Sequence, residues 1–321
     1  MQRISWIDTL KGVLLFLICL SHFSNLSYPI KYLIAPTASY WVPMFFVLSG
    51  YLYQDKRSFK NYIHKKTKTL LIPYFFFSFL FLIADPNTYK NFLGGGDIVE
   101  NIYSIIIVGS GSFKAQPLWF VWVLYGSSIV SFIMIEYIKN NFLKVITILT
   151  LSGITLLLSM SQINCLFHID LILSATVFFT CGYLGKKFIE SFKLFYAMAI
   201  FTLLVGLIGF WINLGDFHFN QIINYPLFYI CPVSLTLSLS IWLKRGKEIS
   251  PLSWIAKNGI IILASHCYLI FTYDFIIKKY NLHFSSNVNF FMQAIFVFGL
   301  LAIIIVPIIN RYCFWAIGKK Q

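Results

Sequence analysis

Long apolar runs recur along this chain of 321 residues, and most are near the length that a helix needs to cross a membrane. A helix spans a hydrocarbon core of about 30 Å with about 20 apolar residues. Ten runs are therefore predicted to be membrane-spanning helices, at residues 6–26, 37–54, 69–84, 117–135, 144–160, 168–185, 194–213, 222–243, 257–277 and 289–310. The apolar segment 98–108 is too short for a span, and we expect it to lie at the membrane interface or to re-enter.

The composition agrees with this prediction. Hydrophobic residues make up 59% of the chain and charged residues only 11%, whereas a soluble domain carries about 25% charged residues. No polar stretch is long enough to form a separate soluble domain. We therefore expect one domain over residues 1–321, an all-α polytopic membrane protein built as a bundle of about ten transmembrane helices.

The distribution of positive charge predicts the orientation. With the N-terminus placed in the cytoplasm, 20 of the 25 Lys and Arg residues fall on the cytoplasmic side. Such a bias is typical of membrane proteins, whose basic residues stay inside, so both termini are expected to be cytoplasmic. The net charge of +14 is explained by this topology and by contact with membrane lipids. It offers no charged face large enough for nucleic acid.

The six cysteines stand singly in apolar segments, with no Cys-x-x-Cys pair and no His–Cys group at zinc-binding spacing. We expect them to be small buried apolar residues, and we expect no metal site. The outer connection 85–116 contains glycine runs at 94–96 and 109–111. It is interpreted as a flexible loop or as a lid over an outer cavity.

Two ionisable residues bracket the first apolar run, which reads KGVLLFLICLSH from Lys11 to His22. Their spacing places them on one helix face, about 16 Å apart along the axis, and Asp8 lies one turn before Lys11 on the same face. Ionisable groups inside a span usually face a cavity or a partner. Lys11 could instead extend to the cytoplasmic headgroups, and His22 could bridge two helices by a hydrogen bond.

Weaker candidates for substrate contact are His266, Ser49 and Asp170. His266 lies in the middle of a predicted span and could equally be a histidine satisfied within the bundle. Ser49 precedes Gly50, and a small-residue contact between helices is the alternative. Asp170 belongs to a group of four residues at the ends of outer loops, with His168, Asp216 and His218. These four could contact a sugar acceptor, or they could be plain solvated groups.

An ordered set of motifs resembles the acyltransferase 3 family of membrane O-acyltransferases, and its fucose 4-O-acetylase-like subgroup in particular. A basic residue, ten residues and then histidine in the first span resemble the family signature, as does the lead-in RISWIDTLKG. Further similar motifs follow in order: FFVLSGYL (45–52), KKTKTLLIPY (65–74), PLWF (117–120), FFTCGYLGKK (178–187) and LASHCYL (263–269).

The resemblance implies an enzyme that transfers an acetyl or short acyl group from CoA to a hydroxyl of a sugar, surface polysaccharide or lipid-linked glycan. Acetyl-CoA would be a donor substrate, with no permanently bound cofactor, and the acceptor could be polyprenyl-linked. The basic loop 55–68 offers Arg57, Lys65 and Lys68 to the donor phosphates, although topology and anionic lipids also explain its charge. Trp119 could stack on the donor or belong to an interfacial aromatic belt.

Acyl transfer to a hydroxyl needs a base, and histidine titrates near neutral pH. We expect His22 to deprotonate the acceptor or to carry the acyl group transiently. Lys11 would orient the thioester or stabilise developing negative charge, and Asp8 would position Lys11. The expected location is a bacterial cytoplasmic membrane. Two other classes remain open: a transporter or flippase for a lipid-linked saccharide, and a non-catalytic membrane subunit.

Overall fold

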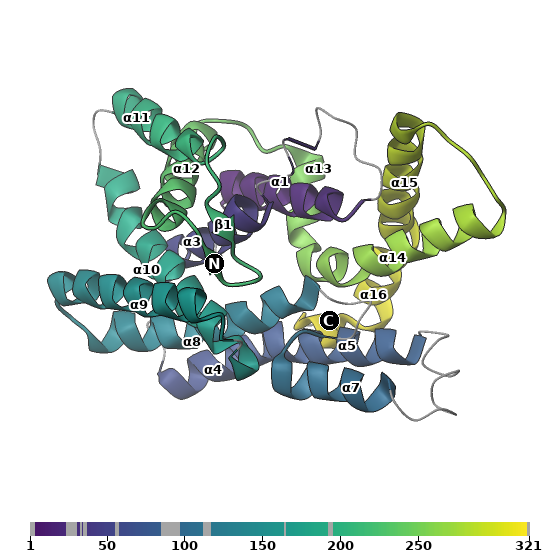
Figure 1. Ribbon diagram of the computed structural model, residues 1–321, viewed down its shortest axis with the longest axis horizontal. Coiled ribbons are helices and arrows are strands. Elements are labelled where there is room, and N and C mark those ends of the chain that lie inside the picture. The colour runs from purple at the N-terminus through teal and green to yellow at the C-terminus, as the bar shows by residue number, and fades with distance from the viewer. Residues whose placement is uncertain are drawn as a thin grey trace. The chain divides into compact units, whose positions relative to one another are not determined.

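The computed structural model describes residues 4–23, 31–32, 34, 37–54, 58–84, 97–111, 117–163, 165–191 and 195–319 (Figure 1). The chain is predominantly helical. Its longer helices are α1 (Ser5–Ser21), α3 (Val42–Tyr51), α4 (Phe59–Lys66), α5 (Ile72–Ala84), α7 (Asp97–Tyr103), α8 (Trp119–Tyr137), α9 (Asn141–Ser161), α10 (Ile169–Ser191), α11 (Phe195–Ile208), α12 (Leu227–Leu243), α13 (Ser250–Lys257), α14 (Gly259–Lys279), α15 (Ser286–Leu300) and α16 (Val306–Tyr312).

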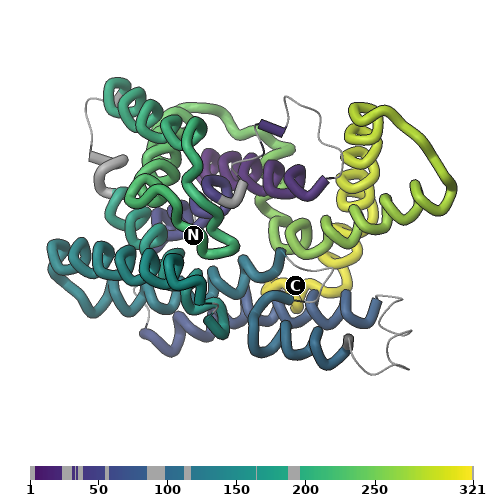
Figure 2. The backbone as a smooth tube through the Cα atoms, viewed as in Figure 1, coloured from purple at the N-terminus to yellow at the C-terminus, as the bar shows by residue number. Residues whose placement is uncertain are grey.

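Short π-helical and 3-10 segments extend several of the α-helices. The π-helical turns are η1 (Thr37–Trp41), η2 (Thr67–Leu71), η3 (Ser104–Val108) and η6 (Leu301–Ile305), and the 3-10 turns are η5 (Leu166–His168) and η7 (Phe314–Ile317). Figure 2 shows the effect in the C-terminal region, where α15, η6 and α16 form one uninterrupted coil. Segment 98–108, predicted as too short to span, is the short helix formed by α7 and η3.

Each of the ten predicted segments contains a helix. Six helices in the described ranges are long and apolar enough to cross a membrane: Phe59–Ala84, Trp119–Tyr137, Asn141–Ser161, Leu166–Lys186, Gly259–Lys279 and Ser286–Tyr312. The protein is therefore an all-α, multi-pass membrane protein in its main architecture. That all ten segments cross the membrane, and that both termini are cytoplasmic, stay predictions.

The chain forms two compact units that interleave along the sequence. The first comprises residues 1–18, 35–59 and 126–257, and the second comprises 19–34, 60–125 and 258–321. Helices α1 and α8 each contribute residues to both units. Each unit takes its segments from distant parts of the chain, so the two units are not consecutive domains. That residues 1–321 form a single domain stays a prediction.

In the first unit, α3 and α10 pack with their backbones unusually close. A Cβ atom added at Gly50 would lie 1.7 Å from the carbonyl oxygen of Phe179, and one added at Gly182 would lie 1.9 Å from that of Val47. Only glycine permits these approaches, because any side chain would overlap the facing backbone. Two of the sequence motifs, FFVLSGYL and FFTCGYLGKK, therefore meet face to face at their glycines.

A small hairpin in the first unit was not predicted. Strands β1 (Gly215–Asp216) and β2 (Gln221–Ile222) pair antiparallel, with Gly215 opposite Ile222. The prediction of a helix from residue 222 was therefore wrong at its start, and α12 begins only at Leu227. The Asp216 carboxylate accepts the backbone N–H of His218 at 2.8 Å, which favours a turn over a helix at this point.

The second unit contains α5 beside the short helix of α7 and η3, as Figure 1 shows near its lower edge. The Tyr74 hydroxyl donates to the carbonyl of Ile105 at 2.8 Å and accepts from the backbone N–H of Gly111 at 3.0 Å. One buried tyrosine thus connects the first turn of η3 with the left-handed Gly111 that follows it. The glycine run at 94–96 lies outside the described residues, so the lid interpretation stays untested.

Candidate functional site

Three side chains that can bind protons or metals meet in the second unit. One ligating atom each from His22, His266 and Cys267 lies within 4.8 Å of the other two. The rings of His22 and His266 are tilted to one another, with their centroids 5.2 Å apart. The structure therefore brings together two histidines that are more than two hundred residues apart in the sequence.

The helices around these residues explain their positions. His22 follows directly after the end of α1, and its side chain is exposed. The sequence predicted one span over residues 6–26 with His22 inside it, but the helix α1 ends at Ser21. His266 lies in the middle of α14 and is fully buried, with an exposed fraction of 0%. Its Nδ1–H donates to the carbonyl of Ile262 at 3.0 Å, one helical turn earlier.

This hydrogen bond decides how His266 can act. A carbonyl oxygen only accepts, so Nδ1 carries the proton and the lone pair resides on Nε2. Nε2 faces the thiol of Cys267, with 3.5 Å between nitrogen and sulfur. The bond satisfies one ring nitrogen, as expected of a histidine within a bundle. It also leaves the other nitrogen directed at the thiol of Cys267.

Lys11 and Asp8 lie together on α1 in the first unit. Both side chains are half-buried, and the Asp8 carboxylate interacts electrostatically with the Lys11 ammonium. The pairing predicted from their spacing along the helix is therefore present. Gly12, which follows Lys11, allows α1 to approach α13, because a Cβ there would lie 2.0 Å from the carbonyl oxygen of Leu252.

The basic residues predicted to contact the donor lie on either side of the junction between α4 and η2. Lys65 is in the last turn of α4, Lys68 is in η2, and both side chains are exposed. They can therefore reach an anionic ligand. Arg57 lies outside the described residues.

The other predicted contacts have mostly structural surroundings. Trp119 begins α8 and is only 8% exposed, with its ring edge-on to Phe120. Stacking on a donor would require this ring to become exposed. The Ser49 hydroxyl donates to the carbonyl of Phe45 at 2.8 Å, and Gly50 beside it packs on α10. This arrangement favours the helix-contact interpretation of Ser49.

The outer-loop residues are grouped only in part. His168 and His218 interact electrostatically, as do His218 and Asp216. Burial lowers the pKa of His218 below its usual value, and the nearby Asp216 carboxylate opposes that shift. Asp170 is buried at the start of α10, and within the described ranges its Oδ1 has no hydrogen-bond partner.

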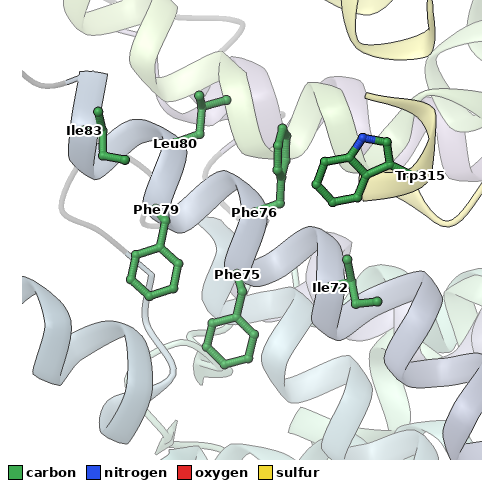
Figure 3. A pocket seen from close by; sticks show the side chains of 7 residues that line it. All are labelled: Ile72, Phe75, Phe76, Phe79, Leu80, Ile83 and Trp315. Atoms are coloured by element: carbon green, nitrogen blue, oxygen red, sulfur yellow. The ribbon is translucent and has the colours of Figure 1, made fainter. Parts of the chain in front are cut away.

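An apolar groove runs along α5 in the second unit (Figure 3). It has a volume of about 450 Å³ and is lined by Ile72, Phe75, Phe76, Phe79, Leu80, Ile83 and Trp315. Trp315 comes from η7 and meets Phe76 edge-on, with ring centroids 5.5 Å apart. Such a surface suits hydrocarbon chains.

Sequence reasoning missed Cys267 as a member of the site. All six cysteines are free; three are buried and three are half-buried, so the expectation of buried apolar residues was right for Cys19, Cys231 and Cys267 only. The one available signal was that Cys267 directly follows His266. That signal gained meaning only when the structure placed His22 beside the pair.

Comparison with known proteins agrees with the ordered motifs. No curated protein and no solved structure matches the chain significantly. A family model described as an acyltransferase domain matches residues 4–311. That match covers nearly the whole chain and both compact units, and it gives the transporter alternative no support. The chain therefore belongs to the acyltransferase 3 family of membrane acyltransferases.

Proposed function

We propose that this acyltransferase moves an acetyl or short acyl group from cytoplasmic acyl-CoA to a hydroxyl of a sugar, a surface polysaccharide or a lipid-linked glycan. The expected setting is a bacterial cytoplasmic membrane, and the motifs favour the fucose 4-O-acetylase-like subgroup. The observation that carries the proposal is the exposed ring of His22 at the end of α1, in a chain that the acyltransferase family model matches from residue 4.

In the proposed reaction His22 acts as the general base. Its unprotonated ring nitrogen takes the proton of the acceptor hydroxyl while the hydroxyl oxygen bonds to the thioester carbonyl carbon. The carbon–sulfur bond then breaks, CoA leaves as a thiolate, and the proton on His22 passes to that thiolate. An exposed base suits this task, because the acceptor must reach the ring directly.

Charged residues elsewhere would bind and orient the donor. Lys65 and Lys68 are exposed cations suited to the phosphates of CoA, and Arg57 is proposed as a third contact. Lys11, held by Asp8, would orient the donor away from the reacting carbonyl, because about 16 Å along the helix axis separates it from His22. Contacts of Trp119 with the donor and of Ser49, Asp170 and His266 with the acceptor stay proposals.

The groove along α5 supports a lipid-linked acceptor. Its seven lining residues are all apolar, and six are aromatic or isoleucine side chains that pack well on hydrocarbon. A polyprenyl chain lying there would hold its saccharide near the membrane surface. A soluble saccharide would gain nothing from this groove.

The test uses purified protein in liposomes with labelled acetyl-CoA and a crude glycan extract. His22→Ala is expected to lower acetyl transfer by about 10²- to 10⁴-fold, the usual contribution of a general base. His283→Ala is the matched control, because His283 is also exposed and lies in the loop before α15. Transfer at the wild-type rate by the His22 variant would falsify the assignment of the base.

Donor binding separates the remaining outcomes. If wild type binds acetyl-CoA but transfers nothing, the extract lacks the acceptor, and fractionated glycans should restore transfer. If wild type does not bind acetyl-CoA at all, acyl-CoA is not the donor and the proposed function fails.

A further inference from the structure

The His22–His266–Cys267 group has the composition of a metal site. Both segments that supply it, residues 19–34 and 258–321, belong to the second unit. Two imidazole nitrogens and one sulfur lie within 4.8 Å of one another. Imidazole and thiolate ligands select zinc and similar transition metals, whereas Mg²⁺ and Ca²⁺ prefer oxygen.

The spacing of the ligating atoms agrees with tetrahedral coordination. Zinc binds sulfur at about 2.3 Å and nitrogen at about 2.0–2.1 Å, so two tetrahedral ligands of these types lie about 3.6 Å apart. The Sγ of Cys267 and the Nε2 of His266 are 3.5 Å apart. These two atoms therefore already have the separation that a shared ion would give them.

The surroundings of His266 favour metal binding independently. Metal-bound histidines almost always donate their other ring N–H to a carbonyl or carboxylate, which fixes the ring and its tautomer. The Nδ1–H of His266 donates to the Ile262 carbonyl at 3.0 Å, so the Nε2 lone pair faces Cys267. His266 and Cys267 are buried while His22 is exposed, which leaves one side open to a water or another small ligand.

We propose that His22, His266 and Cys267 bind one divalent ion of the zinc class, with a fourth coordination position open. Cys267 binds as a thiolate, and its proton is released to solvent. The ion takes up the lone pair of His22. This consequence rests on the proposed function: if His22 is the base, the bound ion stops acyl transfer, because a metal-bound ring cannot take the proton of the acceptor hydroxyl.

Binding is tested first, without reference to activity. Protein purified without a histidine tag is stripped with a chelator and titrated with Co²⁺, a spectroscopic substitute for zinc. We expect one ion per chain and a thiolate-to-cobalt absorption band. Zinc added in equal amount should displace the cobalt and remove the band.

Variants locate the ion. Cys267→Ser should abolish the thiolate band, and His22→Gln should weaken binding at least about tenfold, since even outer-shell changes cost 10- to 100-fold. The exposed position of His22 makes that variant tolerable to the fold. Cys231→Ser is the matched control, because Cys231 is also buried but lies in α12, and it should bind as wild type does. No thiolate band in wild type, or undiminished binding in both site variants, overturns the site.

Activity then tests the link to His22. Zinc should inhibit acyl transfer by wild type, and Cys267→Ser should need at least about tenfold more zinc for the same fractional inhibition of its own rate. Transfer that continues with the ion bound overturns the link. A protein that binds cobalt through Cys267 but never transfers an acyl group keeps the metal site and loses the proposed function.

Discussion

Two regions of this protein use opposite means to place their residues. Where α3 meets α10, the contact depends on side chains that are missing: Gly50 and Gly182 bring each helix against the other's backbone. Where α1 ends near α14, the arrangement depends on side chains that are present, and His22, His266 and Cys267 meet through ring and sulfur atoms. The contact between α3 and α10 cannot accommodate added side-chain atoms, whereas the histidine group depends on the ring nitrogens and the sulfur that it already has.

We therefore expect the glycine contact to determine the stability of the fold and the histidine group to determine the chemistry of acyl transfer. A substitution at the glycine contact should change how well the protein folds, with its effect on transfer following from lost protein. A substitution in the histidine group should change chemistry while the fold survives. Each prediction below tests one side of that separation, beginning with the largest effect.

Gly50→Ala and Gly182→Ala should each lower the free energy of unfolding by about 1–3 kcal/mol, the usual cost of overpacking. The added methyl group would overlap a facing carbonyl oxygen, so the helices must move apart. Thermal unfolding in detergent, followed by circular dichroism, measures the change.

Gly153→Ala is the matched control for this pair. Gly153 lies within α9, and nothing surrounds the position of its added Cβ within 4 Å. Alanine there should raise stability by about 0.5–1 kcal/mol, because glycine is a poor residue inside a helix. Equal losses in all three variants would contradict the close-packing explanation.

Lys65→Ala and Lys68→Ala should raise the KM for acetyl-CoA by up to about fivefold each, since exposed ion pairs contribute about 0.2–1 kcal/mol. Their unfolding transitions should stay at the wild-type temperature, because both side chains are exposed. The increase in KM should shrink at high salt, which screens exposed charges.

Lys139→Ala provides the comparison for these lysines, since Lys139 is also exposed but lies between α8 and α9. Its KM should match that of wild type. A similar increase for all three variants would assign the effect to net charge, and the donor contacts proposed for Lys65 and Lys68 would be withdrawn.

The smallest expected effect concerns His218 in the first unit, where binding of a proton should lower local stability. Its pKa is lowered by burial, so the unfolded chain binds its proton more readily than the folded one. Stability from this group is present above the unfolded value of about 6.5 and is lost as pH falls toward the folded value. Amide hydrogen exchange in residues 209–226 should therefore quicken between about pH 7.5 and about pH 5, after correction for the intrinsic rate.

His218→Gln removes the titrating group and should flatten this pH dependence. If the variant and wild type show the same dependence, another group in the hairpin region is responsible. Titration of His218 would then have no detectable effect on the stability of the first unit.

Hydrophobic length predicted most of the fold, because a span of given thickness allows few alternatives. It placed a helix in each of ten segments but could not find the β1–β2 hairpin, whose short strands carry no long apolar run. It also could not fix where α1 ends. The Asp8–Lys11 pair was predictable from helix periodicity alone, since both residues lie within one turn.

The histidine group could be predicted only in part. His22 was found through its spacing from Lys11 and through its motif, and His266 through its place in a span. Their meeting with Cys267 is a tertiary contact between α1 and α14, and no local pattern carries that information. The close approach of α3 and α10 was likewise hidden, although the glycines themselves were visible in two motifs.

The glycine contact also bears on how the chain is made. Gly50 meets Phe179, and the residues between them must be synthesised before the contact can form. At about 5–20 residues per second, α3 waits on the order of ten seconds for α10. During that interval the backbone around Gly50 is not covered by α10 and is exposed to lipid or to other proteins at the site of membrane insertion. Correct assembly of this enzyme therefore depends on its surroundings keeping that surface vacant until its partner helix emerges.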